Sequence, residues 1–194
     1  QPHQSGVRLL EDNALAFAYR AATAEAAGRS LDIQYYIWKD DLTGRLLASE
    51  LMRAAERGVR VRLLVDDADA RAKHDIFRIA DEHPLIEVRI FNPFYNRYGI
   101  IAKAGEFILR GSRLNRRMHN KAWIVDNRRA ILGGRDIGDE YFDAHPVLNF
   151  RDRDVAAVGP VVADTGRMFD AFWNSALARP VTSRLSAGTP CGLF

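Results

Sequence analysis

The hydrophobic positions of this chain recur with two different periods. Over residues 14–26, 44–57 and 161–176 they return every three or four residues, which is typical of helices that bury one face. Residues 70–82 are also expected to be helical. Between these segments lie short runs rich in branched and aromatic residues, without internal Pro or Gly, which predict strands. The predicted strands are residues 31–38, 59–65, 86–91, 118–125, 129–132 and 153–158.

The order of these elements predicts the class of fold. A strand, a helix and a strand joined by short loops form a right-handed βαβ unit with parallel strands, and a hairpin and a last strand follow later. We therefore predict an α/β fold, a mixed β-sheet with helices on both faces. The 194 residues are enough for one domain with a sizeable core. We assign residues 1–180 to it and residues 181–194 to a tail or linker.

Composition changes this picture little. Hydrophobic residues make up 47% and charged residues 27% of the chain, as in ordinary globular proteins. The net charge of +3 is a mild basic bias that suits phosphate or an anionic membrane surface. Cys191 is the single cysteine, which excludes an intrachain disulfide, and no apolar run approaches the roughly 20 residues that span a bilayer. Because the chain begins with Gln1, we expect upstream sequence, where a signal peptide or anchor could stand.

His119 and Lys121 are the candidate chemical groups. On a strand they face the same way, about 6–7 Å apart, so that one phosphate can touch both. An imidazole can act as nucleophile or general acid and base, and an ammonium can hold phosphate oxygens. The alternative is a hydrogen-bonded His beside a solvated Lys. A metal site is not indicated, because the chain has one Cys and no second His at ligand spacing nearby.

The residues that follow extend this pattern. Asp126 has the opposite strand parity and precedes a turn, so we expect a structural role at the hairpin, such as accepting turn N–H bonds. Gly133 and Gly134 end the next predicted strand, where glycine allows the backbone to approach a ligand closely.

Together these residues resemble a known motif. The string His119-x-Lys121-x4-Asp126-x6-Gly-Gly is similar to the HKD motif HxKxxxxDx6G(G/S)xN of the phospholipase D superfamily. Further segments resemble the bacterial type C cardiolipin synthases over about residues 6–174. These enzymes carry two HKD motifs, and this chain matches only their first half. The segments are residues 33–38, 40–44, 113–121 and 137–142.

The resemblance assigns roles to individual residues. It implies that His119 attacks phosphorus and forms a covalent phosphohistidine, that Lys121 binds the phosphoryl oxygens, and that Asp126 belongs to the catalytic motif. Gly134 is expected beside the substrate. Position 136 is usually Asn, another phosphate contact, but here it is Asp136, which puts an anion near the expected phosphate. Either Asp136 points away from the site, or the affinity for phosphate is reduced, or its neighbours raise the pKa of Asp136.

A carboxylate is also expected to orient the motif histidine, which would fix its tautomer and stabilise its cation. Asp154 is the best match for this role in the resemblance, with Asp152 second. The alternative is that Asp154 simply pairs with Arg151 or Arg153 at the start of its strand.

Two other regions are candidates for substrate contacts. Tyr36 either lines a substrate cleft or packs against a helix. The basic and aromatic residues 94–117 lead into the motif, and Arg117, with Arg113 and Arg116, is the best candidate there for an extra anion contact. Such a run also suits nucleic acid or a solvated surface.

The resemblance implies an enzyme that needs no cofactor and transfers a phosphatidyl group between phospholipids. One HKD histidine attacks while the other protonates the leaving group, so a second lobe is expected, in cis or across a homodimer. The isolated lobe is then expected to be inactive, and the enzyme to lie peripherally on the bacterial inner membrane. The alternatives are a homodimeric phosphodiesterase or nuclease and a non-catalytic phosphate- or lipid-binding module. Nucleic acid is the less favoured partner.

Overall fold

A computed structural model describes residues 4–67, 77, 80–93 and 117–181. In that part of the chain the strands form one eight-stranded sheet in the order β1-β7-β6-β5-β2-β3-β4-β8. The strands are β1 (Gly6–Leu10), β2 (Ser30–Tyr35), β3 (Arg60–Asp66), β4 (Ile86–Phe91), β5 (Ala122–Val125), β6 (Arg129–Gly133), β7 (Asp154–Val158) and β8 (Ala178–Pro180). The helices are α1 (Asn13–Glu25), α2 (Leu42–Glu56), α5 (Pro160–Trp173) and the 3-10 turn η2 (Asp139–Tyr141).

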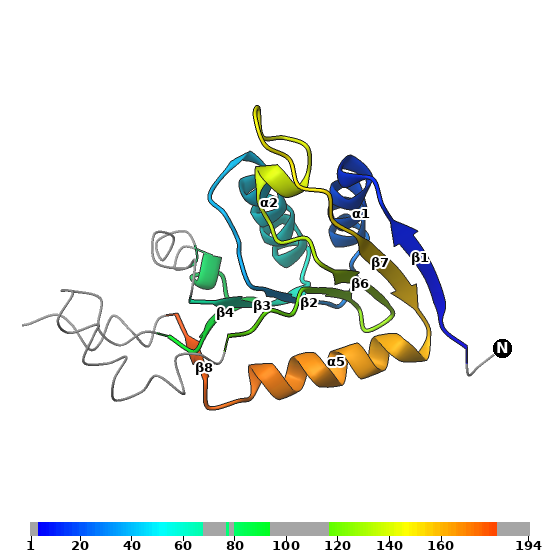
Figure 1. Cartoon of the computed structure of the whole chain (residues 1–194). Helices are drawn as coiled ribbons and strands as arrows, with labels where there is room; N and C mark the ends of the chain where they lie inside the picture. The colour runs from blue at the N-terminus through cyan, green and yellow to red at the C-terminus, as the bar shows by residue number, and fades with distance from the viewer. Residues whose placement is uncertain (1–3, 68–76, 78–79, 94–116, 182–194) are drawn as a thin grey trace, which may run out of the picture.

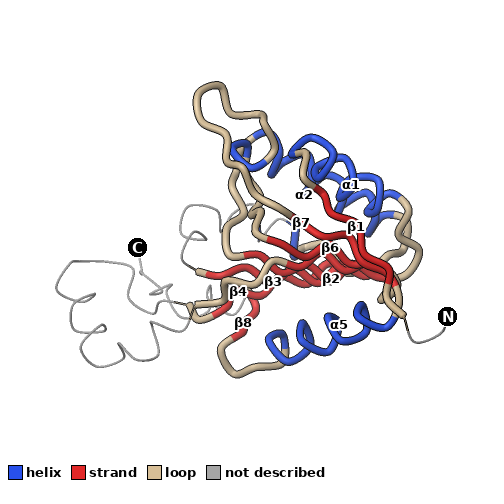
Figure 2. Tube along the Cα trace, turned by 45° about the vertical axis from the view of Figure 1, so that its right-hand side comes forward, coloured by secondary structure: helices blue, strands red, loops and turns tan. Residues whose placement is uncertain are grey.

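The sheet is mixed, as predicted. β2, β3 and β4 are parallel neighbours, whereas β5, β6, β7 and β1 continue the sheet in antiparallel steps from the other edge of β2. Helices α1 and α2 cover one face and α5 lies across the other (Figures 1 and 2). The predicted α/β class with helices on both faces is therefore confirmed.

Strand alternation divides the core between these two faces. Ile33 and Tyr35 of β2 belong to the apolar cluster on the α1 and α2 side. Ala122 and Ile124 of β5 belong to the opposite cluster, together with Phe169 of α5. None of the helices in the described ranges has the length and hydropathy that a bilayer span requires.

Side-chain caps determine where helices α1 and α2 begin. Asp12 caps α1 by accepting a hydrogen bond from the Leu15 N–H at 2.7 Å. Asp41 caps α2 by accepting a hydrogen bond from the Gly44 N–H at 3.0 Å. The Asp41 carboxylate also receives the Asp139 N–H at 2.8 Å, and this ties the start of α2 to η2.

The two outermost strands were missed by the sequence pattern. In β1, Val7 and Leu9 are exposed, because β1 is an edge strand outside the reach of the helices. β8 has only three residues and exists through its pairing with β4. Short edge strands carry little periodic signal, since partner strands rather than burial define them. The expected helix 70–82 lies mostly outside the described residues, as do Arg113 and Arg116.

Candidate active site

His119 and Lys121 lie on an extended segment that enters β5, next to the end of β2. We expected them inside a strand, but the strand begins only at Ala122, opposite Gln34 of β2. β2 stops one residue later, and the Ile37 N–H donates to the Asp136 carboxylate at 2.9 Å instead of continuing the ladder. The motif residues therefore sit at the rim of the sheet, where a ligand has access.

The two side chains converge on Tyr36. The imidazole of His119 is exposed, and its ring centre lies 5.1 Å from that of Tyr36. The ammonium of Lys121 lies 5.4 Å from the centre of the same ring and donates to the His119 carbonyl at 3.0 Å. The structure thus brings together His119 and Lys121, which were expected to share one side of the chain, and Tyr36, for which a cleft position and helix packing were both open.

Asp136 completes this group from the segment after β6. Its carboxylate lies 3.3 Å from the Lys121 ammonium, and the two side chains are only 4% and 3% exposed. Burial raises the pKa of Asp136, although the Ile37 N–H, Lys121 and His119 act in the opposite direction. The anion that the sequence places at this position therefore does not turn away from Lys121.

A hollow of about 430 Å³ opens beside the motif residues. Its wall combines the polar motif residues with apolar side chains from β6 and α5, as a site for a phosphate bound to an apolar group requires. The lining residues are His119, Asn120, Lys121, Leu132, Gly133, Asp164, Thr165 and Met168.

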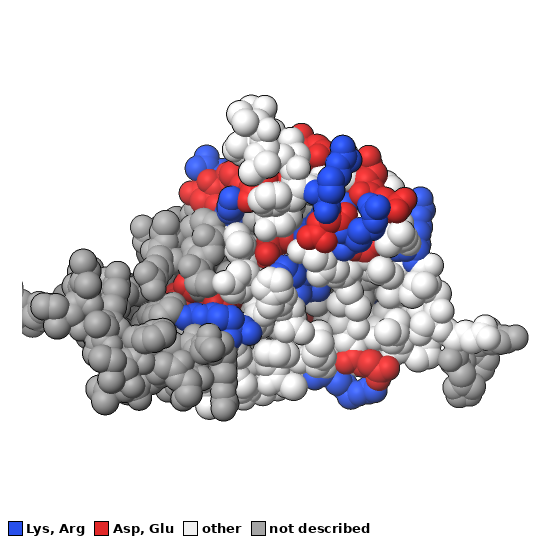
Figure 3. Space-filling model, in the orientation of Figure 1, with Lys and Arg blue, Asp and Glu red and all other residues white. Residues whose placement is uncertain are grey.

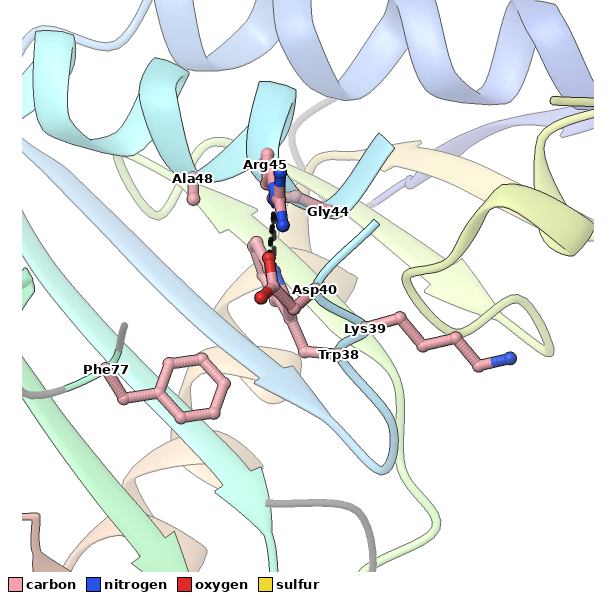
Figure 4. Close-up of a pocket in the computed structure, with 7 residues that line it drawn as sticks. All are labelled: Trp38, Lys39, Asp40, Gly44, Arg45, Ala48 and Phe77. Carbon is pink, nitrogen blue, oxygen red and sulfur yellow. Dashed lines mark hydrogen bonds and ion pairs between the residues drawn. The ribbon is translucent and has the colours of Figure 1, made fainter. Parts of the chain in front are cut away.

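A second hollow, of about 470 Å³, lies at the start of α2 (Figure 4). Trp38, Ala48 and Phe77 form its apolar wall, and Arg45 pairs with Asp40 across it at 2.6 Å. None of the motif residues lines this hollow, so we place the chemistry at the first one.

The glycine pair makes room for carboxylates of the neighbouring strand. A methyl group on Gly133 would collide with Asp154, and one on Gly134 would collide with Asp152. We expected these glycines to admit a ligand. Gly133 does line the hollow, but the close approach that excludes larger residues comes from residues 152–154.

Asp154 belongs to a buried network rather than to the hollow. Its carboxylate is held by Arg20 at 2.9 Å and by Arg135 at 3.2 Å, and the three side chains are at most 1% exposed. Arg20 also donates to the Tyr35 hydroxyl at 2.9 Å. The expected pairing of Asp154 with His119, or with Arg151 or Arg153, is corrected to a pairing with Arg20 and Arg135.

This network was not predicted, although the sequence contains a signal for it. Arg20 lies on the buried stripe of α1 with Ala16, Thr23 and Ala24. A charged residue on an otherwise small and apolar helix face requires a buried counter-ion. Which carboxylate supplies it depends on β7, which is far away along the chain.

Asp126 lies at the opposite end of β5 from His119. Its carboxylate accepts the N–H groups of Gly28, Arg29 and Ser30 at 3.0, 2.7 and 2.9 Å. Burial opposes ionisation, but these three hydrogen bonds outweigh it and lower the pKa of Asp126. Its assignment to the catalytic group is corrected: Asp126 accepts N–H bonds, as expected, but from the α1–β2 connection rather than from its own hairpin.

Replacement of Asp126 by alanine is expected to destabilise the chain by about 1–3 kcal/mol, because three backbone donors lose a charged acceptor. Since folding lowers the Asp126 pKa, this stabilisation is present above the ordinary Asp pKa and is lost as the pH falls through the folded value. Urea unfolding of both proteins at neutral and acid pH measures it. A stability difference that does not shrink in acid would contradict this account.

Arg117 anchors the segment that enters the motif. Its guanidinium lies 3.1 Å from the Asp66 carboxylate at the end of β3. The other oxygen of Asp66 accepts the Met118 N–H at 2.9 Å, so one buried carboxylate holds two consecutive residues. The role of Arg117 in anion binding stays a prediction, whereas its contact with Asp66 positions the motif.

The comparisons with known proteins agree with this geometry. A model of the family "Cardiolipin synthase, PLD-like domain" matches residues 21–173. The chain is 52% identical over 172 residues to cardiolipin synthase C of Escherichia coli, covering 89% of this chain and 36% of that protein. It is 31% identical over 171 residues to cardiolipin synthase A of Pseudomonas entomophila, covering 86% and 33%. The chain thus spans about a third of the length of these relatives.

Solved structures share the fold at low sequence identity. NucT from Helicobacter pylori superposes with a TM-score of 0.66 at 15% identity, over 91% of this chain and 99% of that one. The phosphatidylserine synthase of Haemophilus influenzae superposes with a TM-score of 0.69 at 14% identity, over 95% and 40%. From the family match, the motif and the fold together, the chain belongs to the phospholipase D-like domain family of the cardiolipin synthases.

Proposed function

We propose that this chain is one lobe of an enzyme that transfers a phosphatidyl group through a covalent phosphohistidine at His119. The observation that carries the proposal is the exposed imidazole at a hollow, with the Lys121 ammonium and the Tyr36 ring beside it. An exposed imidazole can reach phosphorus, and a nearly sealed ammonium keeps its charge close to the phosphoryl oxygens.

The reaction proceeds in two displacements. A nitrogen of His119 attacks phosphorus and forms an N–P bond, while the P–O bond to the leaving alcohol breaks. The hydroxyl oxygen of an acceptor phospholipid then attacks phosphorus, the N–P bond breaks, and the hydroxyl proton passes to the base that the second lobe's acid became in the first step. The leaving alcohol needs a proton that His119 cannot supply while it is the nucleophile, so a second lobe must provide the acid.

Of the two acids that the resemblance offered for orienting His119, Asp152 remains, since Arg20 and Arg135 hold Asp154. Asp152 approaches Gly134 beside the hollow and is partly exposed. We propose that its carboxylate accepts a hydrogen bond from the imidazole N–H when substrate is bound.

The proposed phospholipid substrate implies that the enzyme contacts a membrane peripherally, and one loop of the structure supports this. The loop between η2 and β7 projects beyond the helices (Figure 1) and ends in an uncharged tip (Figure 3). Val147 and Leu148 in this loop are 88% and 55% exposed. Around the tip basic and acidic side chains are intermixed (Figure 3), so we assign the contact to these apolar residues rather than to a basic face.

Phosphohistidine is hydrolysed in acid but survives in base, so the labelling reaction is stopped with base. A phospholipid labelled in its phosphate is mixed with this chain alone and with a protein that carries it beside a second lobe. We expect label on His119 in the two-lobed protein, no label after His119→Ala, and no turnover by the chain alone.

Light scattering on the same samples distinguishes a monomeric lobe of a larger enzyme from a homodimer. A monomeric chain agrees with one lobe of a larger enzyme. A dimer that cleaves a chromogenic phosphodiester or DNA without any second lobe would overturn the proposal in favour of a homodimeric phosphodiesterase.

A further inference from the structure

The Lys121 ammonium already has an anionic partner within the site. Its nitrogen lies 3.3 Å from the Asp136 carboxylate and 3.0 Å from the His119 carbonyl oxygen. An ammonium has three N–H donors, and these two oxygens account for two of them. A phosphoryl oxygen that approaches Lys121 therefore meets a carboxylate on the same nitrogen.

Asp136 is held in this position from both sides. The Ile37 N–H donates to its second carboxylate oxygen at 2.9 Å. Arg135, the preceding residue, is fixed by Asn13 and the Leu10 carbonyl. Ile137, the following residue, exchanges backbone hydrogen bonds with Ile37 and Lys39. The carboxylate cannot swing out to solvent without breaking these contacts.

The charges around Asp136 almost cancel. Lys121 is offset by Asp136, and Asp154 offsets the charge of one of its two partners, Arg20 and Arg135, so a formal charge of +1 remains in this buried group. Burial raises the pKa of Tyr35 to about 12, so its hydroxyl adds no charge. An approaching anion therefore meets this small net charge and the imidazole of His119, which also faces Asp136.

Protonation of Asp136 would remove the competition between its carboxylate and a phosphoryl oxygen for Lys121. The neutral carboxyl would leave Lys121 with an uncompensated charge and would gain an O–H donor that can point at a phosphoryl oxygen. An Asn at this position would offer an N–H donor without taking up a proton. Burial raises the pKa of Asp136, which is the direction that favours this protonation.

We propose that Asp136 is a specificity-determining residue of this lobe: its carboxylate competes with phosphate for Lys121, so that a phosphodiester anion binds together with a proton. The inference rests on the proposed function, because it takes the hollow beside His119 as the phosphate site. It predicts that this lobe binds oxyanions weakly at neutral pH and better in acid.

Diethyl phosphate is a suitable probe, because it carries a single negative charge whose protonation does not interfere in the range tested. Its affinity for the 194-residue chain is measured by NMR titration at several pH values. The comparison is made in a His119→Ala background, which removes the imidazole beside Asp136. The variants are His119→Ala alone and His119→Ala combined with Asp136→Asn.

In the His119→Ala protein the affinity is expected to rise as the pH falls. Adding Asp136→Asn is expected to raise the affinity at neutral pH by roughly tenfold, equivalent to about 1.4 kcal/mol, and to remove most of the pH dependence. Asp164→Asn is the matched control. Asp164 lines the same hollow but is exposed and paired with Arg167, so this change should have only a small effect.

Equal affinities and equal pH dependence with Asp or Asn at position 136 would overturn the inference. If Lys121→Met weakens binding while Asp136→Asn does nothing, only the inference fails and the phosphate site stands. If diethyl phosphate binds no variant, the phosphate site itself is wrong, and the inference falls with it.

Discussion

Replacement of Asp154 by alanine is expected to destabilise the chain by about 3–5 kcal/mol, the cost of removing one member of a buried ion pair. Arg20 and Arg135 would both lose their shared carboxylate, and neither can reach water, because both side chains are buried. Urea unfolding followed by circular dichroism measures the loss.

Two comparisons make this test specific. Asp152→Ala removes a carboxylate two residues away that is partly exposed and is expected to cost less than about 1 kcal/mol. The double replacement of Arg20 and Asp154 by Met and Leu should recover part of the loss, since only Arg135, instead of both arginines, is then left without its carboxylate. Equal losses for Asp152→Ala and Asp154→Ala would refute the buried network as the source.

Replacement of Lys121 by methionine is expected to lower phosphatidyl transfer by about 10²–10³-fold in a protein that carries both lobes, the usual effect of removing one preorganised charge from a transition state. Methionine keeps the length and apolar stem of the side chain against Tyr36. The change therefore removes the charge and little packing.

Turnover numbers and unfolding curves together decide how Lys121 acts. A fall in kcat with an unchanged unfolding midpoint supports a role on the phosphoryl oxygens. A fall in stability large enough to explain the lost activity would instead make Lys121 a structural partner of Asp136. Adding Asp136→Asn to Lys121→Met separates these two outcomes, because it restores the lost stability only if an unpaired Asp136 was its cause.

Local hydrophobic periodicity was sufficient to predict the positions of the longer helices and strands. The helices α1, α2 and α5 and the strands β3 and β4 lie within a few residues of their predicted positions. In α2, β3 and β4 the pattern records the buried positions, whereas in α1 Leu15 is exposed and the buried face includes Ala16 and Arg20. The convergence of His119 and Lys121 also followed from the alternation of side chains in extended backbone, even though the strand itself begins later.

Contacts between segments that are far apart in the chain could not be predicted from local periodicity. Three carboxylates with similar prospects in the sequence proved to have different tasks: Asp126 holds the α1–β2 connection, Asp154 neutralises two arginines, and Asp136 faces Lys121. Each task depends on which donors the folded sheet brings to the carboxylate, and those donors come from segments 15–134 positions away in the chain.

The residue order alone was enough to establish the α/β class, the motif and the His119–Lys121 pair, because periodicity and spacing are properties of short stretches. The tertiary structure was needed to assign the acids and to reveal the edge strands β1 and β8. Strand pairing and the burial of charge are set by neighbours in space, and a carboxylate has no single role until those neighbours are in place.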